Sequence, residues 1–234
     1  MDWGMGKRFV VCAVLLAVAV PAGAQAPGDV FRDCEVCPEM VPLPEGDVAL
    51  GRFEVTLGEY RAFSEAVPGV PETGCIRAGR QDHSTDGTAR ALTWRHPGYP
   101  QTGEHPVACV SWNEAQVYAR WLSLVTGHQY RLPTDAEWDR GAADSPRGCY
   151  QRIRNRGGTC AVGSYTPSGA DLYDMVGNVW EWTDDCWNGD CDRRVMRGGG
   201  WLTDDWQLRP DSRSWAGPNR NDGAIGFRVA RALP

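Results

Sequence analysis

The chain has 234 residues, a formal net charge of −6 and 42% hydrophobic residues, with a mean hydropathy of −0.44. These values describe a globular protein that is long enough to bury a sizeable core in one domain. Lys7 is the only lysine. Apart from Lys7, the positive charges are arginines, and acidic groups outnumber them. Such a chain has no surplus of positive charge to replace the counterions of nucleic acid, so we expect no nucleic-acid partner.

The N-terminus has the three parts of a secretory signal peptide. Lys7 and Arg8 precede the apolar run 9–20, and the small residues Ala22, Gly23 and Ala24 form a cleavage site. The apolar run is too short for a stable membrane span. We therefore expect cleavage before Gln25 and a periplasmic or secreted protein without a membrane anchor.

Removal of the signal peptide, residues 1–24, takes away a net charge of +1 and leaves a mature chain of charge −7. We expect a flexible leader over residues 25–30. No internal repeat or low-complexity linker divides residues 31–234, which we predict to be one domain and a monomer. The 28 glycines, 16 prolines and 11 tryptophans are typical of a loop-rich fold with many turns.

Cleavage would also remove Cys12 and leave eight cysteines. An even number of cysteines in an oxidising compartment predicts disulfides, and eight allow about 105 pairings. Here they fall into four neighbouring pairs, which predicts the disulfides Cys34–Cys37, Cys75–Cys109, Cys149–Cys160 and Cys186–Cys191. The alternative for the first pair is half of a zinc site, although the sequence has no second CxxC and no paired histidines.

Three predicted helices begin with the same signal, a hydroxyl residue followed three positions later by a glutamate. These pairs are Thr56 with Glu59, Ser111 with Glu114, and Thr134 with Glu137. The second helix should end at Gly127. Its apolar stripe has helical spacing and is expected to be core rather than a ligand site; the stripe consists of Ala115, Tyr118, Trp121, Leu122 and Val125.

After the second helix, the segment "HQYRLPT" should be extended and end at Pro133. Beyond Gly141 the chain turns to short strand-like pieces, "LYDMVGNVWEWT", "RRVMRGGGW" and "IGFRVARAL". This order predicts an α+β domain whose helices lie in the first half and whose second half is rich in turns and tryptophan.

Seven motifs in this order resemble the sulfatase-modifying-factor domain of formylglycine-generating enzymes. They are "DCEVCPEMVPLPEG", "FEVTLGEYRAF", "HPVACVSWNEAQVYARWLS", "YRLPTDAEWDRGA", "LYDMVGNVWEWTDD", "RVMRGGGW" and "IGFRVAR". The resemblance covers residues 32 to 232 and implies a single-domain, loop-rich variant of the C-type lectin fold. It also implies a role in protein maturation, with a peptide, protein or small-ligand partner.

The resemblance implies copper chemistry only where two cysteines follow the glycine turn. In formylglycine-generating enzymes these cysteines hold copper(I) for the oxidation of a sulfatase cysteine by O2. Here the two positions are Thr203 and Leu208, and neither side chain can replace the soft thiolates that copper(I) prefers. Copper is therefore not expected, unless Cys186 and Cys191, which have the same separation, form a displaced pair.

Relatives without the cysteine pair differ in role, so the resemblance leaves two hypotheses open. The first is an accessory maturation module that binds a ligand or peptide without turnover. The second is an oxidase acting on a cysteine of a sulfatase or another peptide-like substrate, of the formylglycine-generating or siderophore-maturation type. The iron site of the ergothioneine-type relatives needs a helical domain and histidine cluster that this sequence lacks.

The resemblance also implies one Ca²⁺ site, because the family's ligand positions carry suitable oxygens here. A side-chain oxygen, two backbone carbonyls and a glutamate surround the ion in the family, and hard oxygen ligands of this kind suit calcium. The matching positions are Asp174, Gly177, Val179 and Glu181. The alternative is that Asp174 and Glu181 only cap local backbone.

We expect a ligand-binding surface around the glycine turn, where tryptophans could stack on a ligand while charged groups fix its polar atoms. The alternative is that Trp201 and Trp215 fill the core and Asp204 pairs with Arg209. The candidate residues are Arg197, Trp201, Asp204, Asp205, Trp206, Arg209, Arg213 and Trp215.

The remaining polar residues show no catalytic pattern. His83, His96, His105 and His128 lack the spacing of paired metal ligands, and no serine lies in a nucleophile elbow. A general base among these histidines, or among Asp204, Asp205 and Glu181, stays open because sequence gives no geometry. The catalytic residues are unassigned, and hydrolase chemistry is disfavoured.

Overall fold

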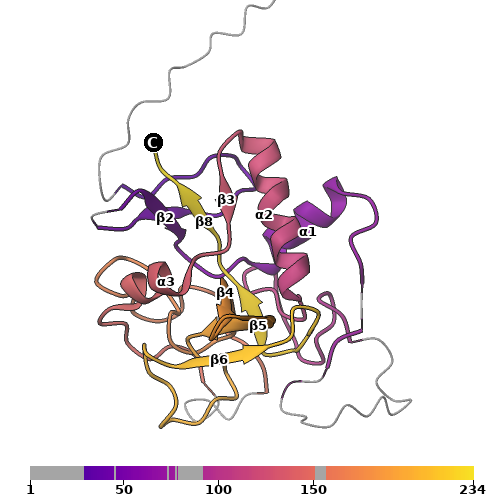
Figure 1. The fold of residues 1–234 in the computed structure, drawn as a ribbon. Helices are drawn as coiled ribbons and strands as arrows, with labels where there is room; N and C mark the ends of the chain where they lie inside the picture. The colour runs from indigo at the N-terminus through magenta and orange to yellow at the C-terminus, as the bar shows by residue number, and fades with distance from the viewer. Residues whose placement is uncertain (1–28, 45, 73, 77, 79–91, 151–156) are drawn as a thin grey trace, which may run out of the picture.

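The computed structural model describes residues 29–234, except 45, 73, 77, 79–91 and 151–156. Two four-stranded sheets and three helices make up a single mixed α+β unit (Figure 1). The predicted signal peptide, most of the predicted leader and His83 lie outside the described residues.

The first sheet joins the two ends of the described chain. Its strand order is β1–β2–β8–β3, and all three pairings are antiparallel. Because β8 lies between β2 and β3, the C-terminal strand closes the sheet that the N-terminal strands begin. Its strands are β1 (Met40–Pro42), β2 (Val48–Gly51), β3 (Tyr130–Arg131) and β8 (Ala230–Ala232).

The second sheet carries the segments expected to bind a ligand or metal. Its order is β6–β5–β4–β7, with antiparallel pairs except for the parallel pairing of β4 with β7. Strand β7 pairs with the end of β4 that carries Glu181. In this pairing Glu181 is opposite Gly226. The strands are β4 (Trp180–Trp187), β5 (Asp190–Arg197), β6 (Arg213–Ala216) and β7 (Ile225–Phe227).

All three predicted helix starts are confirmed, each with both hydrogen bonds of a capping box. The helices are α1 (Leu57–Ala66), α2 (Trp112–Thr126) and α3 (Asp135–Ala142). Helix α2 ends at Gly127, whose φ of +74° provides the left-handed C-cap that a glycine adopts without strain. Four members of its predicted apolar stripe are buried. The fifth, Val125, is 52% exposed and lies about one turn after Leu122, the last buried residue of α2.

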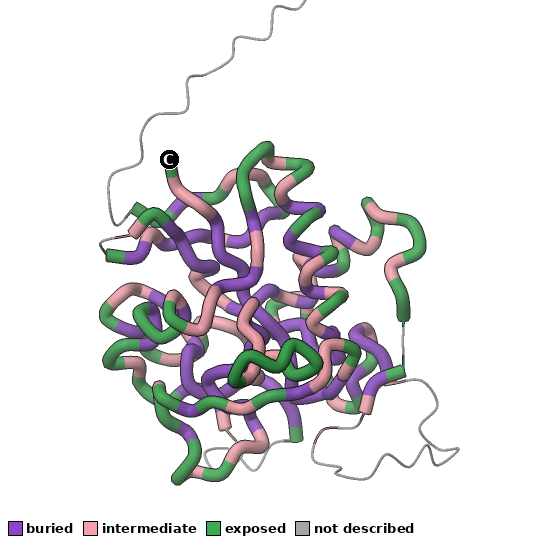
Figure 2. Tube along the Cα trace, viewed as in Figure 1, coloured by how far each residue is buried: buried purple, intermediate pink, exposed green. Residues whose placement is uncertain are grey.

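The core is rich in aromatic rings that interlock between the helices and the sheets. Tyr60 and Phe63 of α1 meet Tyr118 of α2 and Phe227 of β7, with ring centroids 5.2 to 6.3 Å apart. Such edge-to-face and offset contacts stabilise beyond the area they bury. Figure 2 shows that the buried segments lie mainly in the interior of the molecule and the exposed segments at its rim.

The strand expectations for the second half are correct in place but too long. Of "LYDMVGNVWEWT" only the part from Trp180 is strand, and residues 172–179 form turns. The piece "IGFRVARAL" divides into β7 and β8, which belong to different sheets. A single sequence pattern therefore links the two sheets, with the buried Arg228 between them.

Candidate functional site

The loop after β5 brings Thr203 and Leu208 together over Gly199. A Cβ built on Gly199, whose φ is +76°, would lie 2.8 Å from Leu208 Cδ2 and 3.4 Å from Thr203 Oγ1. Thr203 Oγ1 accepts a hydrogen bond from the backbone N–H of Gly200 at 2.8 Å, and Leu208 is buried. Both side chains therefore approach Gly199, but they hold a hydroxyl and an alkyl group, which are not ligands for copper(I).

The sulfur atoms lie elsewhere and are paired. The four disulfides are the predicted ones, so Cys34–Cys37 is a disulfide rather than half of a zinc site. Cys186 and Cys191 are bonded across the turn that joins β4 to β5. Within the described residues, no group of three or more histidine, cysteine or carboxylate side chains has the geometry to hold a metal ion.

Two members of the predicted ligand surface are structural anchors. Arg197 is only 5% exposed, and its guanidinium pairs with Asp135 and Asp139 of α3. Trp201 is 6% exposed, packs edge-on against Tyr99 at 5.3 Å and donates its indole N–H to the carbonyl of Gly223. These side chains hold the glycine turn in place rather than face a ligand.

The other members lie at or near the surface. Trp206 is 69% exposed and Trp215 44% exposed, while Asp204, Arg209 and Arg213 are exposed and Asp205 is half-buried. Arg209 pairs with Asp211 at 3.0 Å, not with Asp204 as the alternative interpretation supposed.

The exposed residues of β6 continue onto the neighbouring hairpin. The guanidinium of Arg213 lies 4.6 Å from the ring centre of Trp187, and that of Arg193 lies 4.4 Å from Trp215. We call Trp187, Arg193, Arg213 and Trp215 the β6 surface. Sequence reasoning missed Trp187 and Arg193, because only the pairing of β5 with β6 brings the hairpin beside these residues.

A buried cluster of charges surrounds the predicted calcium ligands. The guanidinium of Arg228 donates two hydrogen bonds of 2.6 Å to the carboxylate of Glu181, which also accepts the indole N–H of Trp138. Glu54 is buried close by and accepts hydrogen bonds from Asn178 and Val179. Burial raises the pKa of the Glu54 carboxyl well above its usual value, and the nearby charges of Asp174 and Glu181 act in the same direction.

Asp174 provides one oxygen that fits a cation. Its Oδ2 accepts the backbone N–H of Gly163 at 2.7 Å, whereas its buried Oδ1 has no hydrogen-bond partner among the described atoms. Gly177 has a φ of +112°, as a carbonyl-presenting turn requires. Hard oxygens at Asp174 and in this turn suit calcium, but Glu181 would have to share its oxygens with Arg228.

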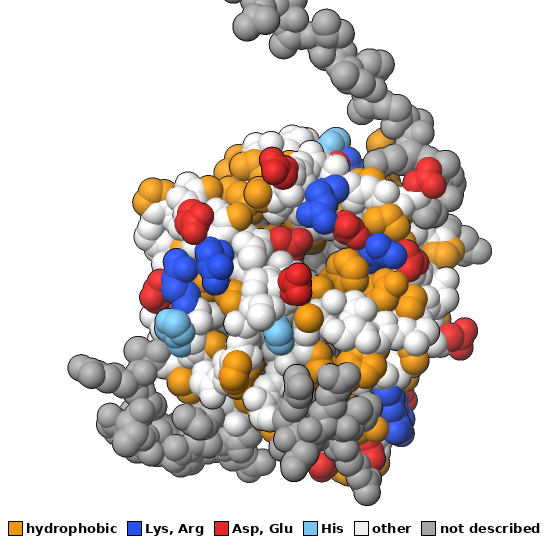
Figure 3. Space-filling view, turned by 180° about the vertical axis from the view of Figure 1, so that it is seen from behind, with side chains coloured by type: hydrophobic (Ala, Val, Ile, Leu, Met, Phe, Trp, Pro, Cys, Tyr) orange, Lys and Arg blue, Asp and Glu red, His pale blue; other side chains and the backbone are white. Residues whose placement is uncertain are grey.

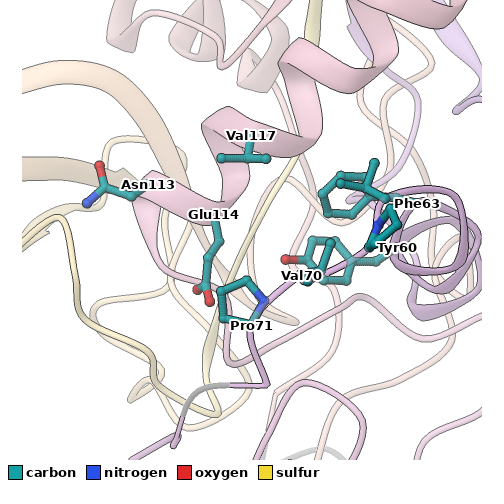
Figure 4. Close-up of a pocket in the computed structure, with 10 residues that line it drawn as sticks. Tyr60, Phe63, Val70, Pro71, Asn113, Glu114 and Val117 are labelled. Atoms are coloured by element: carbon teal, nitrogen blue, oxygen red, sulfur yellow. The ribbon is translucent and has the colours of Figure 1, made fainter.

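Two hollows, each of about 380 Å³, lie away from these residues. The first is an apolar groove between the end of α1 and the start of α2 (Figure 4), lined by Tyr60, Phe63, Val67, Pro68, Gly69, Val70, Pro71, Asn113, Glu114 and Val117. The second is polar and includes His105, whose Nδ1 accepts the backbone N–H of Thr102 at 3.0 Å. Burial lowers the pKa of His105, while the nearby charge of Glu104 acts in the opposite direction.

Basic and acidic side chains are interspersed on the face opposite to that of Figure 1 (Figure 3). Many of the described arginines are engaged in ion pairs, among them Arg52, Arg95, Arg131 and Arg220.

Comparison with known proteins agrees with this architecture. Residues 14–233 match the model of the sulfatase-modifying factor enzyme 1-like domain. The chain is 32% identical to a formylglycine-generating enzyme of Streptomyces coelicolor, over 91% of this chain and 88% of that protein. It is 30% identical to a hercynine oxygenase of Mycobacterium tuberculosis, over 77% of this chain and 52% of that protein.

Solved structures give the same result. The structure of PvdO from Pseudomonas aeruginosa superposes with a TM-score of 0.73 at 30% identity, over 90% of this chain and all of that one. The chain spans about half the length of some curated relatives, such as 49% of the mouse formylglycine-generating enzyme. The chain belongs to the sulfatase-modifying-factor family, and its α+β fold is that family's variant of the C-type lectin fold.

Proposed function

We propose that the protein is an exported accessory module that binds a peptide or a small ligand during the maturation of another molecule, without thiol–copper oxidation. One observation carries the proposal. Thr203 and Leu208 converge over Gly199 where the family's oxidases place two cysteines, and the cysteines of the described chain are in disulfides. A disulfide sulfur lacks the thiolate charge that copper(I) requires.

The β6 surface is the part of the molecule that we propose as the ligand contact, together with Trp206. Strand β6 is the edge of its sheet, and within the described residues its outer side pairs with no other strand. An extended peptide can add to such an edge through its backbone, while exposed indoles and guanidinium groups select its side chains. Trp206 and Trp215 supply the large, rigid apolar area that anchors a ligand.

We also propose that one Ca²⁺ stabilises the domain, with Asp174, Glu181 and the carbonyls of Gly177 and Val179 as ligands. The support is electrostatic and geometric. Glu54, Asp174 and Glu181 are buried together, and the described groups around them include one guanidinium, that of Arg228. A divalent cation at Asp174 Oδ1 would balance the remaining negative charge and provide the partner that this oxygen lacks.

Export is part of the proposal and rests on the signal-peptide pattern of residues 1–24. Four disulfides fit an oxidising compartment, because thiols in the cytosol are kept reduced. Among the described residues, none of the helices has the length and apolar character needed to cross a membrane. We propose a monomer in the periplasm or outside the cell.

The oxidation half of the proposal is tested with the purified mature protein, O2 and a cysteine peptide of the sulfatase type, with and without copper. Mass spectrometry should show no conversion of the cysteine to an aldehyde. Copper-dependent conversion that is lost in Cys186→Ser would overturn the proposal and favour the alternative, an oxidase of a peptide cysteine.

The binding half is tested by retention of the protein on an immobilised library of extended peptides. The double variant Trp206→Ala/Trp215→Ala should lose at least about tenfold in retention, since exposed aromatic anchors dominate binding energies. Leu124→Ala on α2 is the matched control, because Leu124 is 85% exposed and lies outside the β6 surface. Equal retention of both variants would contradict the assignment of the surface.

A further inference from the structure

The disulfide at the turn between β4 and β5 differs from the other three in its exposure. Each of the others includes at least one buried cysteine, namely Cys37, Cys75 and Cys109, or Cys149. Cys191 is exposed and Cys186 is half-buried. Figure 2 shows the tip of this hairpin as one of the exposed segments of the second sheet. A thiol in solution can therefore reach this bond without unfolding of the domain.

A positive charge is fixed beside one of the two sulfurs. Arg194 Nη1 lies 3.5 Å from Cys186 Sγ and donates to the carbonyl of Asp184 at 3.1 Å. The guanidinium stacks on Trp112, with its central carbon 3.8 Å from the ring centre. Hydrogen bonding and stacking hold the charge in place, so a thiolate on Cys186 would form next to a cation that is already positioned.

The other sulfur has no such cation fixed against it among the described hydrogen bonds. Asp190 and Asp192 are the neighbours of Cys191 in the sequence, and Asp190 pairs with Arg193 at 3.3 Å. A thiolate on Cys191 would therefore lack the stabilisation that Arg194 gives to a thiolate on Cys186. Since the sulfur with the lower thiol pKa leaves faster, the two ends of this bond are chemically unequal.

We propose that Cys186–Cys191 is a reactive disulfide that oxidises a pair of thiols in a peptide substrate. A substrate thiolate attacks the exposed Sγ of Cys191, the Cys186–Cys191 bond breaks, and Cys186 leaves as a thiolate beside Arg194. The second substrate thiolate then attacks the substrate sulfur of the mixed disulfide and releases Cys191. The substrate loses two electrons and two protons and gains a disulfide, while Cys186 and Cys191 become thiols.

The disulfide lies in the same hairpin as Trp187 and Arg193 of the β6 surface, and the reaction needs no metal. The bond itself is the oxidant for one turnover. The expected substrate is a neutral or basic peptide with two cysteines. Asp190 and Asp192, the neighbours of Cys191 in the sequence, would repel a negatively charged peptide.

The first test follows the four disulfides during limited reduction of the folded protein. After stepwise addition of dithiothreitol and alkylation, peptide mapping should show that Cys186–Cys191 opens at least about tenfold faster than the other bonds. Arg194→Gln should slow this opening several-fold, whereas Arg194→Lys should keep most of the rate. Arg120→Gln is the matched control, because Arg120 is an exposed arginine of α2.

The second test measures the reaction and its direction with a neutral dicysteine peptide as the probe. One peptide should be oxidised per protein chain, and rapid acid quenching should trap the probe on Cys191 with Cys186 free. The variant Cys186→Ser/Cys191→Ser should oxidise none while keeping the circular dichroism of the folded protein. Opening of all four disulfides at one rate, equal rates in Arg194→Gln and Arg120→Gln, or trapping on Cys186 would overturn the proposal.

Discussion

Two pairs of positions in this molecule are each separated by five residues, and they differ in every property that matters for copper. Cys186 and Cys191 carry sulfur, but they are bonded to each other at an exposed hairpin. Thr203 and Leu208 carry no sulfur, but they converge over a glycine turn in the loop after β5. The pair with sulfur atoms and the pair in the loop after β5 are thus two different pairs of residues.

The difference teaches that spacing alone does not identify a metal site. A five-residue separation across a hairpin turn brings two cysteines to disulfide distance, with their Cα atoms 4.4 Å apart. The same separation in the loop after β5 brings both side chains against Gly199, where they occupy the space that a Cβ would need. The backbone around each pair therefore decides what the pair can do.

The largest expected effect comes from moving thiols into the loop. The double variant Thr203→Cys/Leu208→Cys should bind one copper(I) per chain, whereas the natural protein should bind none at these positions, because two converging thiolates are soft ligands of the preferred kind. A competition titration against a coloured copper(I) chelator measures the binding.

The matched control for that variant is Leu202→Cys/Gln207→Cys. It has the same five-residue separation in the same loop, but neither side chain is among those that meet over Gly199. Equal copper affinity in the two double variants would show that the convergence of Thr203 and Leu208 has no chemical meaning.

A second effect concerns a buried ion pair at the start of β4. Glu181 at the start of β4 pairs with Arg228, and both side chains are fully buried. Arg228→Met should lower the free energy of unfolding by about 3 to 5 kcal/mol, since it leaves a buried carboxylate without its partner. Urea denaturation measures the loss. Arg32→Gln breaks the more exposed pair with Glu39 and should cost at most about 1 kcal/mol.

A third effect is a pH dependence that originates at Asp174. Burial raises the pKa of Asp174 to about 6 from its usual 3.8. The folded protein therefore binds more protons than the unfolded chain between these values, and its stability should fall as the pH rises from about 4 to about 6. In the presence of a chelator the loss should be on the order of 3 kcal/mol.

Asp174→Asn is the control for this pH dependence, because the amide keeps the shape and does not titrate. Thermal denaturation at pH 4, 5, 6 and 7 should give a flatter profile for the variant than for the natural protein. Added Ca²⁺ should restore stability to the natural protein above pH 6. Identical profiles for the two proteins, with and without calcium, would contradict both the pKa and the calcium proposal.

The smallest effect is expected in α3, which contacts both the β4–β5 hairpin and the end of β5 before the loop. The backbone N–H of Asp135 donates to Asp185 next to the hairpin disulfide, while the Asp135 carboxylate pairs with Arg197 before the loop. Thr134→Ala removes the N-cap of α3 and should cost about 1 kcal/mol in denaturant unfolding. Thr134→Ser keeps the hydroxyl and should cost little, and equal losses in both would exclude the cap as the cause.

Local features of the fold follow from the sequence, whereas long-range ones do not. The capping boxes of α1, α2 and α3 are confirmed, because each depends on residues three positions apart. The predicted cysteine pairs are confirmed too, although Cys75–Cys109 spans 34 residues. Strands β1 and β2 had no such signal. Nor did the parallel pairing of β4 with β7, which joins segments more than 40 residues apart.

The candidate site shows the same difference between local and long-range features. The prediction that Thr203 and Leu208 match the family's copper positions comes from counting along one loop, and in the structure both side chains lie against Gly199. The predicted ligand surface mixed buried and exposed residues, because burial of Arg197 depends on α3 and burial of Trp201 on Tyr99. Glu54 went unnoticed because its neighbour Asn178 lies 124 residues away.

The most direct test of the central claim is a count of free thiols in the mature protein, purified under native conditions without reductant. Alkylation followed by mass spectrometry should find no labelled cysteine, four disulfides in the predicted pairing, and no bound copper. Two labelled thiols at Cys186 and Cys191 with one copper ion per chain would contradict the account, because the chemistry and the geometry of the copper site would then lie in the same hairpin.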